Sequence, residues 1–587
     1  MKRLLSFIVT ALVFTTADAV GQILTANVII SKADIERAGL SIPASAIGEP
    51  VSSVKLYAPL WKEATDATPA YGVVEGSIFP VDPNGWPINF RLLLPASWSH
   101  RAMQSGGGGM NGMIMLREDR NPMLNKGFAV YGSDAGHQAT GTGFGGRQSK
   151  PLATGPTSGD EWALNEEAVR NLGYMQMKKT HDAAMVIIER VYGKRPDYNY
   201  YIGGSQGGRE GLVVAQRYPA DYDGIISDVP IVNFSTLMLA PELIRMQEKP
   251  VANWVTPSKV KAITAEFLRQ CDTLDGLADG IINNYLASRA IFDVTDGIGP
   301  TDPWAALRTL NGIDPDPNPN DTSASAKLTN GQIQTLEFCY SPYKFTTPLA
   351  NGIKSFGMWL PTITPDDFGM VTTTRYKGQE GAGENASFFT FLGTLGITGF
   401  LMQDLKANSL DYVEGGPLNK RREEISEWLD ATNPDLSAFY KRGGKIIITI
   451  GTMDNTASSG AQLDYYQSLI DKMGQKKIDD FARLYVIPQA GHALMGKSYK
   501  MNGEGKSVTV RNIPRPDSDD KIDLLISWVE KNQAPPKTLV VGEKGRINIK
   551  VEGKGYPLCS YPNYPRYTKG PAEMVSSYAS TASVRVP

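Results

Sequence analysis

The chain has 587 residues, of which 41% are hydrophobic, so it is long enough to bury a large core and to form more than one domain. Its 59 basic and 61 acidic residues nearly balance and leave a formal net charge of -2. A near-neutral chain without a long basic stripe does not match a phosphate backbone, and this argues against a nucleic-acid partner.

The first residues have the order of a secretory signal peptide. Lys2 and Arg3 precede an apolar run over residues 4–14, and a small-acidic-small triplet ends at Ala19. This run is too short to anchor a protein in a bilayer, and no later segment reaches about 20 unbroken apolar residues. We therefore expect cleavage after Ala19 and a secreted or periplasmic protein without a membrane anchor. A buried first helix is the alternative.

Strand-like and helical segments alternate on both sides of the chain's middle region. Residues 163–192 keep apolar side chains at helical spacing and predict one long helix or two short ones. The β-prone run 198–204 leads directly into another helical segment. Farther on, strand-like runs at 445–450 and 483–487 flank a helix over 459–473. This alternation predicts an α/β fold with a mainly parallel sheet.

The middle of the chain has a different composition. It is rich in Pro, Gly and Asn, as in DPDPNPNDTSAS, and has few strand-like runs, which indicates a domain inserted into the α/β core. The sequence thus predicts a signal peptide over 1–19, a first part of the core over 20–232, an inserted domain over 233–440 and a second part of the core over 441–587.

Ser205 lies in the chain's one G-x-S-x-G pattern, Gly-Gly-Ser-Gln-Gly at 203–207. In a chain with 59 glycines the pattern alone could arise by chance as a flexible loop. Its position between a predicted strand and a predicted helix is the context of a nucleophile elbow, where the serine sits on a strained turn. We therefore expect Ser205 to be a catalytic nucleophile.

A serine nucleophile requires a base, and the chain has four histidines. His492 follows the predicted strand 483–487, at the edge of the sheet where α/β enzymes place their sites. His181 falls inside a predicted helix and His100 precedes the glycine-rich segment, so structural roles are expected for both. A structural role for His492 is the alternative to catalysis.

The imidazole in turn requires a carboxylate, and Asp454 follows the predicted strand 445–450. The chain order Ser205, Asp454, His492 is that of the α/β-hydrolases. Asp228, just after another strand-like run, competes for this role, and a solvated turn is the other reading of Asp454. The two oxyanion donors are expected to be the N–H of Gln206 and an N–H of the segment 106–109, with Gly107 or Gly108 as the donor.

The segment CDTLDGLADGII holds three aspartates, Asp272, Asp275 and Asp279, among glycines. Such an oxygen-rich cluster suits calcium, although its spacing is not that of an EF-hand and a solvated acidic turn is the alternative. The three cysteines allow at most one disulfide and leave a thiol over, and the sequence does not indicate which pair would join.

Together these segments resemble the tannase and feruloyl esterase family, which also contains bacterial hydrolases of mono(2-hydroxyethyl) terephthalate. The likeness rests on several stretches across most of the chain: GGGGMNG, SDAGH, GGSQGGREGLVVAQRYPADYDGII, CDTLDGLADGII, DLSAFYKRGGKIII and YPNYPRY. It implies an α/β-hydrolase core with a large lid, the triad Ser205, Asp454 and His492, and a structural calcium in the lid. The calcium ligands would be side chains of Asp272, Asp275 and Asp279 and carbonyls of Leu277 and Ile281.

The chain departs from that family in two places. Members usually join a cysteine before the nucleophile to another after the histidine, and here these positions are Gly204 and Ala493. Members also commonly show His-Gly-Trp where this chain has Ile-Gly-Thr at 450–452. The first departure removes that bridge and predicts a looser site or an atypical substrate.

The sequence therefore predicts a serine carboxylic ester hydrolase that acts on small aromatic esters of the feruloyl or galloyl type. Terephthalate half-esters or acyl groups of polysaccharides are the alternative substrates, and a calcium-dependent binding protein on a decayed hydrolase scaffold is the alternative class. Four aromatic residues of the lid are expected to contact the acyl group, or else to pack its core: Phe388, Phe389, Phe391 and Phe400.

Overall fold

The computed structural model describes residues 26–116, 118, 121–138, 152–156, 159–318, 326–366, 378–380, 395–548 and 553–583. The predicted signal peptide therefore lies outside the described residues, as do Phe388, Phe389 and Phe391. Among the described helices, none combines the length and apolar character needed to cross a membrane.

A central sheet of eleven strands organises the described part of the chain. In sheet order its strands are β15 (Ala482–Ile487), β14 (Lys445–Gly451), β11 (Gly224–Asp228), β10 (Tyr198–Gly204), β8 (Arg101–Ser105), β9 (Phe128–Ser133), β6 (Ile88–Pro95), β5 (Tyr71–Phe79), β3 (Ser53–Leu56) and β2 (Ser41–Ile42), with β4 (Leu60–Lys62) also paired to β5. The run from β15 to β9 is parallel, and the pairs from β9 to β2 are antiparallel. The sheet is thus mixed, and the expected parallel order holds in the half that carries the predicted site.

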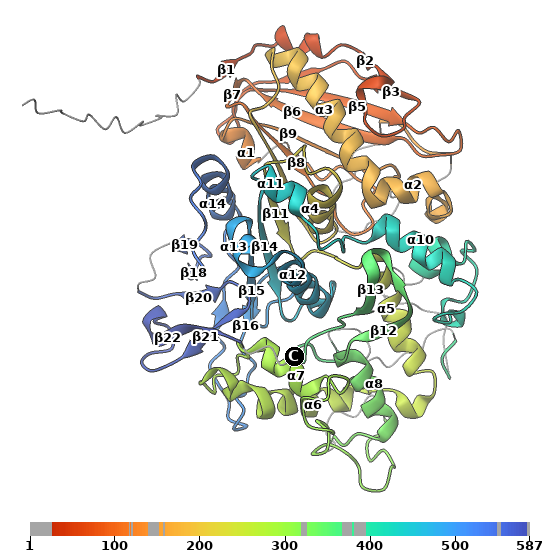
Figure 1. Ribbon diagram of the computed structural model, residues 1–587, viewed down its shortest axis with the longest axis vertical. Helices are drawn as coiled ribbons and strands as arrows, with labels where there is room; N and C mark the ends of the chain where they lie inside the picture. Colours follow the sequence, from red (N-terminus) through yellow and green to blue (C-terminus); the bar gives the residue numbers. More distant parts are fainter. Residues whose placement is uncertain are drawn as a thin grey trace, which may run out of the picture.

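Helices cover both faces of the parallel half, which is why its strands read as continuous apolar runs. In β14, Ile446, Ile448 and Ile450 pack in one cluster with helices α4 and α12, whereas Ile447 packs on the opposite face with α14. The helices next to the sheet are α1 (Pro122–Asn125), α3 (Gln176–Tyr192), α4 (Gln206–Arg217), α12 (Ser459–Met473), α13 (Gln475–Phe481) and α14 (Ser518–Lys531). Figure 1 shows this sheet and its helices in the upper and left parts of the molecule.

The predicted helix over 163–192 is interrupted rather than regular. A 3-10 turn, η3 (Asp160–Leu164), is followed by α2 (Glu166–Arg170), a π-helical turn η4 (Asn171–Met175) and then α3. A π turn lengthens the spacing of the backbone hydrogen bonds and leaves carbonyls available to other donors. The carbonyls of Leu172 and Gly173 accept hydrogen bonds from the guanidinium of Arg209 in α4.

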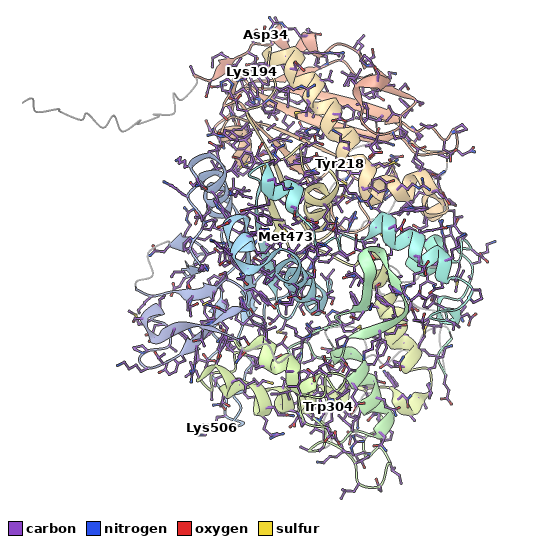
Figure 2. The ribbon with its side chains drawn as sticks, in the orientation of Figure 1. Asp34, Lys194, Tyr218, Trp304, Met473 and Lys506 are labelled. Atoms are coloured by element: carbon purple, nitrogen blue, oxygen red, sulfur yellow. The ribbon has the colours of Figure 1, made fainter. Side chains whose placement is uncertain are left out.

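The segment predicted as an inserted domain is largely helical and lies mostly in the lower part of Figure 1, with α10 (Asn419–Leu429) at the right and α11 (Ser437–Lys441) in the upper half. Its elements are α5 (Phe234–Gln247), α6 (Pro257–Cys271), α7 (Tyr285–Phe292), α8 (Asn330–Tyr340), the hairpin β12 (Tyr343–Leu349) and β13 (Ile353–Phe356), the π turn η8 (Gly396–Leu401), α10 and α11. Trp304, labelled in Figure 2, is fully buried and packs edge-on against Phe267 of α6. The hydrophobic cluster around it continues to Trp162 and Leu172, so the inserted segment shares its core with the first part of the chain.

Small sheets complete the described chain. They are β1 (Val28–Ile29) with β7 (Ser97–Trp98), β16 (Gly496–Lys497) with β17 (Asn512–Ile513), the three strands β19 (Ile547–Asn548), β18 (Thr538–Val541) and β20 (Tyr556–Cys559), and β21 (Asn563–Tyr567) with β22 (Tyr578–Ala582). The pair β16 and β17 follows His492 and lies beside the acidic segment 272–283.

Candidate active site

Ser205 occupies a sharp turn between β10 and α4. Its backbone has φ 61° and ψ -120°, a strained conformation for a residue with a side chain. The Ser205 N–H donates to the carbonyl of Asp228 on the neighbouring strand at 2.8 Å. A Cβ at Gly203 would lie 2.4 Å from the Gly207 carbonyl, so the strand and helix approach closely only because that position is glycine. The turn has the geometry expected of a nucleophile elbow.

Asp454 and His492 lie at the same edge of the sheet as this turn. They follow β14 and β15, and the strand order β10, β11, β14, β15 brings the ends of these parallel strands together. His492 Nδ1 lies 2.9 and 3.0 Å from the two carboxylate oxygens of Asp454. The carboxylate is fully buried, whereas a quarter of the imidazole side chain is exposed. Because Nδ1 must carry a proton to bond the carboxylate, Nε2 is the basic nitrogen.

The surroundings of these two side chains set their charge. Asp454 Oδ1 also accepts from the backbone N–H groups of Thr456 and Ala457, at 3.0 and 2.9 Å, which fixes the carboxylate in place. Burial opposes protonation of His492, but the charge of Asp454 and its hydrogen bond outweigh this and raise the pKa of His492 above its usual value. The imidazole is thus both oriented and made more basic.

The structure separates Asp228 from this pair. Lys521 of α14, itself buried, places Nζ 2.6 and 2.5 Å from the two carboxylate oxygens of Asp228. The carboxylate that competed with Asp454 in the sequence is therefore held in an ion pair on the α14 side of the sheet.

The other histidines are buried and have structural partners. His100 Nε2 bonds the carbonyl of Ala26 at 2.9 Å, and His181 Nδ1 bonds Asp182 at 3.0 Å. His137 stacks on Trp162, with ring centroids 3.8 Å apart, and burial lowers the pKa of His137 to about 3. His137 is therefore neutral at any pH at which the protein is expected to work.

The glycine-rich segment lies against the start of α4, and we call residues 106–112 the oxyanion loop. The N–H of Gln206, in the first turn of α4, has no partner within its own helix. The prediction that Gly107 could be the second donor is wrong, because its N–H donates to the buried carboxylate of Glu210 at 2.9 Å. Gly108 stays the predicted donor, because its N–H has no hydrogen-bond acceptor among the described residues and a Cβ there would meet no atom within 4 Å.

Two buried charged residues on α4 were missed by the sequence reasoning. Arg209 donates to the carbonyls of Gly173, Leu429 and Leu172 at 2.8, 2.8 and 2.6 Å. Glu210 faces the oxyanion loop instead. The sequence did contain a signal for them. Arginine and glutamate are adjacent in a helix that was expected to pack against the sheet, and charged residues are rarely buried without a partner.

Phe400 is the one predicted substrate contact inside the described residues. It is buried in η8, and its ring meets Trp162 edge-on with centroids 5.8 Å apart. Its contacts are those of a core residue at the boundary between the inserted segment and the first part of the chain.

The acidic segment is buried rather than solvated. Asp272 and Asp275 are almost inaccessible, and desolvation raises their pKa values to about 6 and about 7. Burial also raises the pKa of Asp279, whose carboxylate pairs with Arg511 at 2.6 Å. Two buried carboxylates and the part-buried Asp279 are thus accompanied by one ion pair, that of Asp279 with Arg511, and a hard cation would balance the remaining negative charge when Asp272 and Asp275 are ionised.

The structure does not close these aspartates into a tight ligand cluster. In the described chain, the group of three acidic or histidine side chains whose ligand atoms all lie within 4.8 Å is His181, Asp182 and Asp221. Lys178 already occupies that group, with Nζ 2.8 Å from Asp182 and 3.0 Å from Asp221. The N–H groups of Leu277 and Ile281 donate to Asp275 and Asp279, so these two residues belong to the acidic segment's turn.

Gln489 joins the acidic segment to the histidine loop. It is buried, has φ 50°, and precedes His492 by three residues. Its side chain accepts from the Ile282 N–H at 2.7 Å and donates to the carbonyls of Gly280 and Lys497, each at 2.9 Å. The acidic segment is therefore in direct contact with the loop that holds the imidazole.

Comparisons with known proteins show which family the chain belongs to. Residues 72–581 match the family described as tannase and feruloyl esterase. An uncharacterized esterase of Agrobacterium fabrum is 32% identical over 564 residues, covering 92% of each chain. A mono(2-hydroxyethyl) terephthalate hydrolase of Piscinibacter sakaiensis is 27% identical over 547 residues, covering 86% of this chain and 85% of the relative.

A solved structure shows the same fold. The crystal structure of feruloyl esterase B from Aspergillus oryzae superposes with a TM-score of 0.66 at 20% identity, covering 91% of this chain and 98% of that one. The fold is that of an α/β-hydrolase. By its sequence match over most of its length, this chain belongs to the tannase and feruloyl esterase family of carboxylic ester hydrolases.

Proposed function

We propose that this protein is an exported serine esterase that cleaves small aromatic carboxylic esters through Ser205, His492 and Asp454. The observation that carries the proposal is the His492–Asp454 hydrogen bond, at the sheet edge that also holds the strained Ser205 turn. A buried carboxylate that orients an imidazole beside a serine elbow is the arrangement that acyl transfer requires.

The reaction follows from the roles of these groups. His492 Nε2 removes the proton from Ser205 Oγ as the oxygen attacks the ester carbonyl carbon. The N–H groups of Gln206 and Gly108 stabilise the resulting oxyanion. The tetrahedral intermediate collapses, His492 returns the proton to the leaving alkoxide, and the acyl group remains on Ser205 as an ester. Water then attacks with His492 again as base, releasing the acid and restoring the serine.

The substrate class is an aromatic acyl ester of the feruloyl or galloyl type. The family match and the aromatic residues at the boundary of the inserted segment support this choice, with Phe400 and Trp162 among the described ones. Terephthalate half-esters are the second candidate, because the relative from Piscinibacter sakaiensis is named for that activity. The first residues of the chain support export to the periplasm or the medium.

We also propose calcium as a structural ion of the acidic segment. The donor chemistry fits, because the buried Asp272 and Asp275 and the part-buried Asp279 offer three carboxylates, whose charge exceeds that of Arg511. Carbonyls of Leu277 and Ile281 would complete the ligand set. When bound, the ion would supply positive charge that keeps these carboxylates ionised and holds the segment against the histidine loop.

Active-site labelling and a substrate panel together test the catalytic proposal. A fluorophosphonate probe should label the wild type once, and Ser205→Ala should lose both this label and ester turnover. Turnover of methyl ferulate, methyl gallate and mono(2-hydroxyethyl) terephthalate then ranks the substrate classes. Labelling that persists in Ser205→Ala would contradict the assigned nucleophile, and a protein that turns over none of these esters would favour the binding-protein alternative.

A further inference from the structure

Glu210 is a fully buried carboxylate in the second turn of the helix that starts at the nucleophile. It accepts four hydrogen bonds, two at each oxygen. Oε2 accepts from the Gly107 N–H at 2.9 Å and from the Tyr201 hydroxyl at 2.7 Å. Oε1 accepts from the side-chain amides of Asn111 at 2.7 Å and Gln176 at 3.1 Å.

This set of partners is matched to a carboxylate. An ionised carboxylate only accepts, and its two oxygens have about four lone-pair sites, so all four donors are satisfied at once. The partners come from the oxyanion loop, from β10 and from α3. One buried side chain therefore joins three separate elements of the core to the helix that carries Ser205.

The oxyanion loop is held by Glu210 on both sides of Gly108. Gly107 is attached through its backbone N–H and Asn111 through its side-chain amide. The Gly207 N–H also donates to the Gly107 carbonyl at 3.1 Å, so the loop lies directly on the start of α4. The segment between these anchors contains Gly108, the predicted second oxyanion donor.

We infer that Glu210 is the positioning residue of the oxyanion hole. It fixes the loop relative to α4 so that the N–H groups of Gly108 and Gln206 point to one place. Glu210 touches neither the substrate nor the reacting atoms, and it acts through Gly107 and Asn111. The inference rests on the proposed function, because it assigns a device to the same ester-hydrolysing site.

Removal of the carboxylate tests this role. Glu210→Ala detaches both ends of the loop, so we expect kcat to fall about 100-fold, as when an oxyanion donor is lost, with KM changed less than about threefold. Tyr201→Phe is the matched control, because it removes one donor from the same carboxylate and leaves both loop anchors intact. Its kcat should stay within about twofold of the wild type, although it too loses a buried hydrogen bond.

Two further measurements separate positioning from general destabilisation. Glu210→Gln should recover part of kcat, since its amide oxygen can still accept from Gly107, and its NH2 can donate to Asn111 Oδ1, a buried atom without a partner in the described residues, once the Asn111 amide flips. Phenylboronic acid, which forms a tetrahedral adduct with a serine, should lose affinity for Glu210→Ala in parallel with kcat. Benzoate, which makes no such adduct, should bind wild type and variant alike.

The outcomes are distinguishable from those of the proposed function. An active wild type with an equally active, folded Glu210→Ala would overturn this inference alone, as would equal losses in Glu210→Ala and Tyr201→Phe. A loss confined to KM would also overturn it. If Glu210→Ala does not fold, Asn111→Ala takes its place, and a wild-type kcat in that variant counts against the inference. A wild type that neither turns over esters nor is labelled at Ser205 would overturn both proposals.

Discussion

The buried Lys521 and the part-buried Asp228 form an ion pair one strand away from Asp454, with Nζ 2.6 and 2.5 Å from the two carboxylate oxygens. Two aspartates therefore end neighbouring strands of the same sheet, and each has a different partner. One faces a lysine and the other a histidine, so their removal should have different consequences.

Asp454→Asn should lower kcat/KM by about 10⁴-fold with little loss of stability, because the amide no longer holds the catalytic tautomer of His492. Asp228→Asn should instead cost about 3 to 5 kcal/mol in the free energy of unfolding, since Lys521 becomes a buried charge without its partner. Ester kinetics and denaturant unfolding on both variants check this. Equal kinetic losses in the two variants would contradict the assignment of Asp454.

The pH dependence of kcat/KM should show an acidic limb whose midpoint lies above 6.5, the ordinary pKa of histidine. The raised pKa of His492 means that more of the base is protonated near neutrality, and a protonated imidazole cannot accept the Ser205 proton. A stopped-flow or steady-state profile measures the midpoint. A midpoint below the ordinary value would show that burial outweighs Asp454.

The same group affects stability with the opposite sign. A pKa raised by folding means that the native state binds the proton more tightly, so this contribution is fully present below 6.5 and is lost as pH rises through the native pKa. The pH range that favours activity is therefore the range in which His492 stabilises the fold least.

Calcium removal should make stability strongly dependent on pH. Without the ion, burial disfavours the ionised carboxylates of Asp272 and Asp275 in the native state. Their pKa values therefore rise from 3.8 to about 6 and about 7. The native state then binds protons more tightly than the unfolded state, so its stability falls as pH rises from about 4 to about 7. Thermal melts in EDTA should show a lower Tm at about pH 8 than at about pH 5, and calcium should abolish most of that difference.

A kinetic consequence follows from the position of Gln489. Because it joins the acidic segment to the loop of His492, chelation should also lower kcat before the protein unfolds. Gln489→Ala should show a smaller response of kcat to EDTA than the wild type. A melt that is indifferent to calcium at every pH would contradict the proposed ion.

The thiols should be inert in the folded protein. Cys271, Cys339 and Cys559 are buried and are not joined by disulfides, and burial raises the pKa of Cys271 to about 12 and raises those of the other two. Ellman's reagent should therefore react with none of the three until denaturant is added, and then with all of them. Activity should be unchanged by dithiothreitol, in contrast to a site held by a disulfide between its catalytic loops.

The sequence indicated the parts of the site that local pattern encodes. The glycine-framed serine after a β-prone run, and single polar residues after strands 445–450 and 483–487, are short-range signals. The predicted helix over 459–473 agrees with α12 to the residue. These features follow from hydrophobic periodicity and turn chemistry, which do not depend on distant contacts.

Features set by tertiary contact were not predictable in this way. The commitment of the Gly107 N–H to Glu210 joins residues 103 positions apart, and the partner of Asp228 lies 293 positions away. The antiparallel half of the sheet was missed because strands such as β5 and β6 are buried on both faces and lack the alternation that marks a half-exposed strand. The Gly503 N–H, in the loop between β16 and β17, reaches Asp272 from 231 positions away, a contact that forms only after folding.

Arg209 ties the inserted segment to the helix that carries the nucleophile. Its guanidinium spans the nucleophile helix, the π turn and the last carbonyl of α10, and all of these contacts are buried. Moving α10 away from the sheet would remove one carbonyl acceptor from this buried cation, at a cost of about 1 to 3 kcal/mol. Chimeras that exchange the inserted segment should therefore keep a carbonyl where Leu429 now provides one.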